Sequence, residues 1–361
     1  MNWTVWVSLA GGLVALVAGA EFLVRGASHL AARFGISPLV IGLTVVAFGT
    51  SAPEMAVSAI SAWKGQPDLA VGNVVGSNLF NVLAILGLSA LMAPLTVAAR
   101  IVRLDVPIMV GCSLLLWVMA LDGVIRFWEA ALLFLGIIGY TVVQVRFAKG
   151  EKDEAVKQEF AGEYSEPAFA KHSWAVDVGA ILGGLGLLIA GSHFLVESAV
   201  DIARAMGVSE LVIGLTIVAA GTSLPELATS VLASIRGERD IAIGNIIGSN
   251  IFNILAVLGV AGLVRRDGLP VSGQVLALDL PVMVAVAVAC MPLFLDLTIG
   301  RGKGLFFLAA YFVYTAYLVL SAQGSSAVPG FRDAMLAYVL PLTGMTIVSI
   351  AVQSARQRRQ G

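Results

Sequence analysis

Residues 40–54 read VIGLTVVAFGTSAPE, and residues 212–226 read VIGLTIVAAGTSLPE. The match extends without a gap, at a constant offset of 172, over residues 39–91 and 211–263, where about 30 of 53 positions are identical. Similarity over so long a window indicates an internal duplication. The chain therefore carries two copies of one structural unit.

The duplication continues on both sides of this window. Upstream, residues 22–24 (Phe-Leu-Val) correspond to residues 194–196, and downstream, at an offset of 174, Asp105 corresponds to Asp279. The upstream match gives the first apolar segment a partner in the second copy. Because that segment also lacks the basic n-region of a signal peptide, we expect it to be kept as a helix.

The composition indicates a membrane protein. Hydrophobic residues make up 58% of the 361 positions and charged residues 12%, which lies outside the usual soluble range. Eleven apolar stretches have about the length that an α-helix needs to cross a bilayer, and they lack the alternation of a membrane β-barrel. The sequence therefore predicts an all-α polytopic membrane protein. The predicted spans are residues 4–27, 38–62, 69–92, 103–120, 126–147, 174–198, 210–235, 240–263, 275–295, 303–322 and 334–353.

Five predicted helices separate equivalent points of the two copies. Because five is an odd number, the second copy must lie inverted in the membrane, related to the first by a pseudo-two-fold axis in the bilayer plane. We expect a first repeat over residues 1–148, a cytoplasmic linker over 149–173 and a second repeat over 174–322. An extra transmembrane helix and a basic cytoplasmic tail would follow over residues 323–361. The expected fold is thus ten helices in two inverted five-helix repeats, with an eleventh helix added.

The distribution of basic residues predicts the orientation. With the N-terminus outside, the segments that face the cytoplasm hold 16 of the 22 Lys and Arg residues, and the opposite side holds six. Because an excess of Lys and Arg marks the cytoplasmic side, we expect the N-terminus outside and the C-terminus in the cytoplasm.

Two glutamates lie well inside apolar segments. Glu54 and Glu226 follow Pro53 and Pro225 in the predicted second and seventh helices. A carboxylate in the hydrocarbon layer costs at least a few kcal/mol, so the default inference is function. Helices two, three, seven and eight hold no Lys, Arg or His except at their ends, which argues against a structural ion pair. Because the prolines and the preceding Gly-Thr-Ser weaken the helix, we expect a break that exposes oxygens to a cation.

Further polar side chains recur at helical spacing around these glutamates. Thr50 and Thr222 lie four residues before the glutamates, on the same predicted helix face, with Ser51 and Ser223 beside them. Stripes that repeat every four residues follow on the third and eighth helices. These stripes consist of Asn73, Ser77 and Asn81 and of Asn245, Ser249 and Asn253.

Several asparagines have an alternative interpretation, because amides also join membrane helices by hydrogen bonds. For Asn73 and Asn245 the ligand and the structural interpretation carry equal weight. Asn78 and Asn250 lie off the stripes, which favours a structural role for both.

All candidate ligands are hard oxygens, which select sodium, calcium or protons over zinc and copper. The three histidines form no cluster in the sequence, and Cys112 and Cys290 are interpreted as reduced core residues. We expect no resident cofactor and no nucleic-acid partner. Two close carboxylates in a low dielectric cannot both remain ionised and empty, so the site should hold a divalent cation, several monovalent cations or protons. Such a site favours obligate exchange of one cation for another.

The doubled motif resembles the two α-repeats of the calcium:cation antiporters, the family that includes the sodium/calcium exchangers. The matching segments are residues 49–54 with 72–81 and residues 221–226 with 244–253. The resemblance covers about residues 1–322. It implies two inverted five-helix halves in which the first and sixth helices slide across a fixed bundle, and it implies a prokaryotic inner membrane.

The resemblance also implies a shared site for calcium and sodium, with Glu54 and Glu226 as ligands of both ions. The other implied ligands, through hydroxyl, amide or backbone oxygens, are Thr50, Thr222, Ser51, Ser223, Ser77, Ser249, Asn81, Asn253, Ala47 and Ala219. Some relatives that exchange sodium carry an acid at the position of Asn253, so this site has one fewer ionisable group. The extra C-terminal helix is a second departure from the family pattern.

Three other functions stay open. A calcium/proton antiporter would use the same two glutamates, because protons also neutralise an empty site. A passive cation channel is another use of carboxylates at the midplane. A membrane enzyme is disfavoured, because the helices show no metalloprotease His-Glu-x-x-His, no Gly-x-Ser-x-Gly and no paired aspartates.

Overall fold

The computed structural model describes residues 3–150, 174–207 and 219–323, and the single residues 325, 328 and 348. Within these ranges eight helices are long and apolar enough to span a membrane, and a bent helix pair over residues 38–63 makes a ninth span. The prediction of an all-helical, multi-pass membrane protein is confirmed. The predicted linker, the start of the seventh predicted helix and, apart from Val348, the eleventh lie outside the described residues, so the count of ten stays a prediction.

The helices of the first half follow the predicted spans, and short π-helical stretches, labelled η, join some of them into continuous spans. They are α1 (Trp3–Phe34), α2 (Pro38–Ile41), η1 (Gly42–Val46), α3 (Ala47–Thr50), α4 (Ala52–Trp63), α5 (Pro67–Leu79), η2 (Phe80–Ile85), α6 (Leu86–Met92), η3 (Ile101–Asp105), α7 (Val106–Ala120) and α8 (Phe127–Gly150).

The second half repeats this order. Its helices are α10 (Trp174–Ala205), α12 (Ala219–Gly221), α13 (Leu224–Arg236), α14 (Arg239–Phe252), η6 (Asn253–Val257), α15 (Leu258–Val264), η7 (Val275–Asp279), α16 (Leu280–Leu293) and α17 (Arg301–Ala322). The spans α5–η2–α6 and α14–η6–α15 are the most buried of all, so they form the centre of the bundle.

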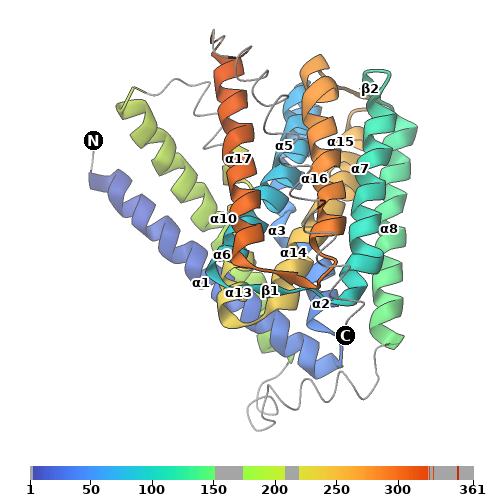
Figure 1. Cartoon of the computed structure of the whole chain (residues 1–361). Coiled ribbons are helices and arrows are strands. Elements are labelled where there is room, and N and C mark those ends of the chain that lie inside the picture. The colour runs from blue at the N-terminus through green and yellow to red at the C-terminus, as the bar shows by residue number, and fades with distance from the viewer. Residues whose placement is uncertain are drawn as a thin grey trace.

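Helices α1 and α10 are longer than predicted and pack on each other. Each has 32 residues, or about 48 Å at 1.5 Å per residue, which exceeds a hydrocarbon layer of about 30 Å. Figure 1 shows both crossing the other helices obliquely. A Cβ placed at Gly12 would lie 2.9 Å from the carbonyl oxygen of Gly191, and one at Gly19 would lie 2.8 Å from that of Gly184. The two helices are therefore antiparallel, and glycines let their backbones approach closely.

Four short strands link the two halves. β1 (Leu95–Thr96) pairs antiparallel with β4 (Thr298–Ile299), and β2 (Val124–Ile125) pairs with β3 (Leu269–Pro270). At the repeat offset of 174, β1 corresponds to β3, and β2 corresponds to β4. The β1–β4 pair is therefore the repeat equivalent of the β2–β3 pair. Figure 1 shows β1 and β2 at opposite ends of the bundle. Each end is thus closed by one strand from each half.

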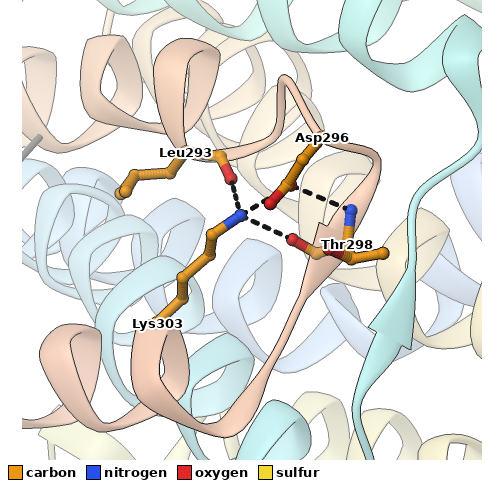
Figure 2. A network of polar contacts seen from close by, with 4 residues as sticks. All are labelled: Leu293, Asp296, Thr298 and Lys303. Atoms are coloured by element: carbon orange, nitrogen blue, oxygen red, sulfur yellow. Dashed lines mark hydrogen bonds and ion pairs between the residues drawn. The ribbon is translucent and has the colours of Figure 1, made fainter. Parts of the chain in front are cut away.

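A lysine holds the turn between α16 and α17 (Figure 2). Lys303 Nζ donates to the carbonyl oxygens of Leu293 and Thr298 at 2.7 and 2.8 Å, and to Asp296 Oδ1 at 2.6 Å. The bond to Leu293 satisfies a carbonyl group that the end of α16 leaves without a helical partner, and the bond to Thr298 ties the lysine to β4. In the first half the equivalent position is Glu129, whose Oε2 accepts from the Arg126 backbone N–H at 2.7 Å. The same turn is therefore held by a cation in one half and an anion in the other.

Candidate cation-binding site

Both predicted helix breaks are present. Ser51 separates α3 from α4 with φ −81° and ψ 6°, and Ser223 precedes α13 with φ −90° and ψ 10°. The segments on either side of Ser51 are bent by 44°. Pro53 and Pro225 lie in the first turns of α4 and α13, where a missing N–H costs no helical hydrogen bond. The sequence therefore starts a new helix immediately before each glutamate.

The break changes one expected relation. Thr50 ends α3 and Glu54 lies in α4, so the two do not share a continuous helix face as predicted. Thr50 Oγ1 is instead 3.0 Å from Asn245 Oδ1 and 3.1 Å from the Val46 carbonyl oxygen. A hydroxyl carries one hydrogen, so it donates to one of these acceptors and keeps lone pairs for a cation.

The two carboxylates are fully buried and each is bound by the other half. Ser51 Oγ donates to Glu226 Oε1 at 3.0 Å, and Ser223 Oγ donates to Glu54 Oε1 at 2.8 Å. The serine at each break therefore binds the glutamate beyond the other break. This reciprocal contact brings residues 172 positions apart in the repeat into one site.

The two serines of the stripes are not equivalent. Ser77 Oγ donates to Glu54 Oε1 at 3.4 Å and lies 3.0 Å from Ser223 Oγ. Its counterpart Ser249 is buried, and its Oγ has no hydrogen-bond partner in the described part of the chain. The Glu54 side of the site is therefore more fully hydrogen-bonded than the side of Ser249.

Asn73 uses both ends of its amide to join helices. Its Nδ2 donates to the Glu54 carbonyl oxygen at 3.3 Å and to Ser58 Oγ at 3.0 Å, and its Oδ1 accepts from Thr222 at 3.3 Å. With every polar atom engaged, the geometry favours the structural interpretation for Asn73.

Asn245 repeats this arrangement in the second half. Its Nδ2 donates to Ser230 Oγ at 2.9 Å and to the Glu226 carbonyl oxygen at 3.5 Å, and its Oδ1 accepts from Thr50. Ser58 and Ser230, which hold these amides, were not singled out as polar residues of the site. The sequence signal that could have identified them is that both copies have serine at this position.

Asn81 and Asn253 are fully buried, and they differ from Asn73 and Asn245 because their amide oxygens have no partner within the described residues. They belong to a larger group of unpaired atoms. Among the buried side-chain oxygens without a hydrogen-bond partner in the described part of the chain are Glu54 Oε2, Glu226 Oε2, Asn81 Oδ1, Asn253 Oδ1 and Ser249 Oγ. Each such oxygen costs about 1–3 kcal/mol when left unsatisfied, so the group as a whole favours a bound cation.

Two predicted ligands are backbone carbonyls. The carbonyl oxygen of Ala47 accepts from the Ser51 N–H at 3.1 Å and also lies 3.4 Å from Thr50 Oγ1. Ala219 is the first residue of α12 and lies one turn before Ser223.

None of the ion pairs found among the described residues involves Glu54 or Glu226. The same residues also contain no group of three or more His, Cys, Asp or Glu that could hold a metal ion. A cation here would meet two carboxylates together with hydroxyl, amide and carbonyl oxygens. That donor set suits calcium or sodium rather than a soft transition metal.

Comparisons with known proteins agree with this chemistry. A family model described as "Sodium/calcium exchanger protein" matches residues 4–146 and 176–320. The inner membrane protein YrbG of Escherichia coli is 36% identical over 312 residues, which cover 85% of this chain and 94% of that protein. The sodium/calcium exchanger MaX1 of Methanosarcina acetivorans is 33% identical over 311 residues, covering 76% and 87%. The solved structure of the sodium-calcium exchanger NCX_Mj, soaked with sodium and calcium, matches with a TM-score of 0.74 at 30% identity, covering 88% of this chain and 99% of that one.

Proposed function

This chain belongs to the sodium/calcium exchanger protein family, and from that premise we propose that it exchanges calcium for sodium by alternating access, with both ions bound between Glu54 and Glu226. It is a membrane cation antiporter and not an enzyme. The observation that carries the proposal is the set of five unpaired buried oxygens from predicted ligands, which include one oxygen of each glutamate.

The donor set supports calcium as one transported ion. Calcium takes six to eight oxygen ligands in flexible geometry. Two carboxylates balance its charge, and the remaining oxygens are supplied by neutral groups: Thr50, Thr222, Ser51, Ser223, Ser77, Ser249, Asn81, Asn253, Ala47 and Ala219. Several sodium ions would satisfy the same carboxylates, which is the basis for competition between the two ions.

The burial of the carboxylates supports obligate exchange. The Coulomb repulsion of two desolvated negative charges is large when neither carboxylate is neutralised. An empty site is therefore too costly to move between the two sides of the membrane. Transport of one cation then requires return with another.

Strand pairing supports the proposed ten-helix inverted architecture. Paired strands lie at the same end of the bundle, so the number of crossings between them must be even. Three described spans lie between β2 and β3: Phe127–Phe147, Trp174–Ala205 and Arg239–Val264. We therefore expect a fourth crossing in the segment that ends in α13, whose start lies outside the described residues. Together with the bent pair over residues 38–63, the count then becomes ten.

An asymmetry of packing supports alternating access. Both α1 and α10 pack on α13, whereas neither packs comparably on α4, its counterpart in the first half. One of two equivalent surfaces is therefore covered by the long helix pair. In the opposite state we expect the pair to cover α4 and to uncover α13.

The charges of the turns support the proposed orientation, with the N-terminus outside. In that orientation the turn with Arg301 and Lys303 lies in the cytoplasm, and the equivalent turn over residues 121–129, with Arg126 as its one basic residue, lies outside, as the positive-inside rule favours. The name of the E. coli relative supports placement in an inner membrane.

The decisive experiment measures calcium uptake into proteoliposomes that contain the purified chain. At fixed pH, with the membrane potential clamped, an outward sodium gradient should drive uptake of radiolabelled calcium. Glu54→Gln should abolish that uptake without changing the amount of folded protein in the vesicles. Calcium uptake at the same rate with and without the sodium gradient would contradict the proposal.

The same vesicles separate the alternatives. The calcium/proton alternative draws on the neutral amide of Asn253 and on two buried carboxylates that protons would neutralise. It predicts uptake driven by a pH gradient in the absence of sodium. A channel predicts calcium flux that needs no counter-ion.

A further inference from the structure

Two buried asparagines lie behind the proposed site and are not among its predicted ligands. Asn78 on α5 and Asn250 on α14 occupy equivalent positions in the two halves, and their side chains are 3% and 2% exposed. Their hydrogen bonds lead to Asn81 and Asn253, whose amide oxygens belong to the unpaired group.

Each of these asparagines accepts a hydrogen bond from the other half. Asn253 Nδ2 donates to Asn78 Oδ1 at 3.1 Å, and Asn81 Nδ2 donates to Asn250 Oδ1 at 3.4 Å. An amide carries its donor and its acceptor on the two arms of one planar group. Because the nitrogen arms of Asn81 and Asn253 are engaged in this way, their oxygen arms are left for another partner, and none is present within the described residues.

The orientation of Asn78 and Asn250 is itself determined by their surroundings. Asn78 Nδ2 donates to the backbone carbonyl oxygen of Asn250 at 3.3 Å and lies 3.6 Å from Met283 Sδ. Asn250 Nδ2 lies 3.5 Å from Met109 Sδ. Neither a carbonyl oxygen nor a thioether sulfur donates hydrogen bonds, so turning either amide around would place two acceptors against each other. Both residues therefore present their oxygens to the neighbouring amides.

We propose that Asn78 and Asn250 are positioning residues: Asn78 turns the Asn253 amide, and Asn250 the Asn81 amide, so that each ligand oxygen faces the cation. This inference rests on the proposed calcium site and adds residues that do not touch the ion. Residues behind a metal ligand fix its orientation, and their loss typically weakens metal binding by about 10- to 100-fold.

The two positions should differ in strength. Asn78 is held by a backbone carbonyl oxygen, which is a strong acceptor, whereas Asn250 is held by a thioether sulfur, which is a weak one. The orientation of Asn253 is therefore better determined than that of Asn81. Asn78→Ala should weaken calcium binding by about tenfold or more, and Asn250→Ala by less.

A double-mutant cycle separates positioning from packing. Asn253→Asp replaces the amide by a carboxylate, both arms of which are oxygens. In either orientation this side chain presents an oxygen to the cation, so it needs no positioning residue. In that background Asn78→Ala should cause no weakening of calcium binding. The matched control combines Asn78→Ala with Asn81→Asp, a change at a residue whose amide is hydrogen-bonded by Asn250 rather than by Asn78, and the weakening should persist there.

The measurement is the calcium Kd of the full chain in detergent, by titration calorimetry in sodium-free buffer at fixed pH. The expected result is that Asn78→Ala weakens binding in the unaltered chain and has no effect in the Asn253→Asp background. Equal weakening in both backgrounds would overturn the inference. The cycle of Asn250→Ala with Asn81→Asp tests the same idea independently if Asn78→Ala does not fold. Failure of the unaltered chain to bind calcium would overturn the proposed site itself, which distinguishes the two outcomes.

Discussion

The segments that carry Glu54 and Glu226 are copies of one repeat and yet meet different neighbours. α4 and α13 pack on equivalent core helices, α4 on α5 and α15, and α13 on α14 and α6. Helices α1 and α10 add a further layer over α13 and leave α4 without one. Pro225 is accordingly buried, whereas its counterpart Pro53 is half-buried.

This difference shows which parts of the molecule obey the repeat. The two serine–glutamate contacts are equivalent in the two halves, and so are the two strand pairs. The position of the α1–α10 pair on the bundle has no equivalent in the other half. Because the pair packs on itself through glycines along its length, we expect it to move as one body and to cover one of the two equivalent surfaces at a time. The asymmetry therefore does not follow from the duplication, and in the proposed mechanism it belongs to one of two conformational states.

The largest expected effect tests whether the two halves contribute equally to one site. Glu54→Gln and Glu226→Gln should each lower sodium-driven calcium uptake at least about 100-fold, because each removes a charge that balances the divalent ion. Uptake is measured in proteoliposomes with matched protein content. Glu129→Gln, at a buried glutamate outside the site, is the control and should retain uptake. A normal rate from either site variant would show that the halves do not share the site.

The next effect concerns the unequal hydrogen bonding of the carboxylates. Ser223 Oγ contacts both Glu54 and Ser77, whereas Ser51 Oγ contacts Glu226. Hydrogen bonds to charged groups are worth about 1.5–3 kcal/mol, so Ser223→Ala should raise the calcium KM by about tenfold or more. Ser51→Ala should raise it less. Equal KM values for the two variants would contradict the asymmetry of the site.

A third test compares adjacent glycines in the long helix pair. A Cβ at Gly12 would lie 2.9 Å from a backbone oxygen of α10, whereas one at Gly11 meets no described atom within 4 Å. Gly12→Ala should cost about 1–3 kcal/mol by overpacking and lower the Tm in detergent, and Gly11→Ala should not. In the second half Gly184→Ala and Gly183→Ala should repeat this contrast. Similar Tm values within each pair would show that the contact does not hold the helices together.

The smallest expected effect concerns an ion pair that only one half has. Arg236 of α13 binds Glu21 of α1 through two bonds of 2.7 and 3.1 Å, whereas the equivalent positions, Lys64 and His193, are both basic. Because the pair is exposed, its loss costs at most about 1 kcal/mol. Glu21→Gln should shift the ratio of exchange rates in the two directions by less than about fivefold, and high salt should remove the shift.

Charge exchange is the control for that prediction. Glu21 also pairs with Arg25, so the exchange is made in an Arg25→Gln background, where Glu21→Arg with Arg236→Glu should restore the ratio because it rebuilds the pair with the charges reversed. His193→Glu places an acid at the position equivalent to Glu21, and it should shift the ratio the opposite way. A shift in the same direction would show that the pair does not favour one of the two states.

Individual residues show how far the sequence could be interpreted. The breaks at Ser51 and Ser223 were predictable, because glycine and proline have local effects on a helix. The role of Asn73 was not predictable, because an asparagine can either bind a cation or join helices through hydrogen bonds. The contacts of Asn73 with Ser58 and Thr222 favour the second role. The extra length of α1 and α10 was also missed, since polar residues near their ends hid the continuing helix.

The sequence by itself determined the membrane class and the duplication, and it predicted the inversion that an odd number of helices implies and the residues available for a cation site. Those properties depend on the composition, on the spacing of motifs and on whether the number of helices between the copies is odd or even. All three can be counted along the sequence. Only the tertiary structure decided which end of each amide is engaged and which half the long helices cover. The orientation of each amide depends on hydrogen-bond partners in the other half. The two copies present equivalent surfaces to one helix pair, and in this structure that pair packs on one of them.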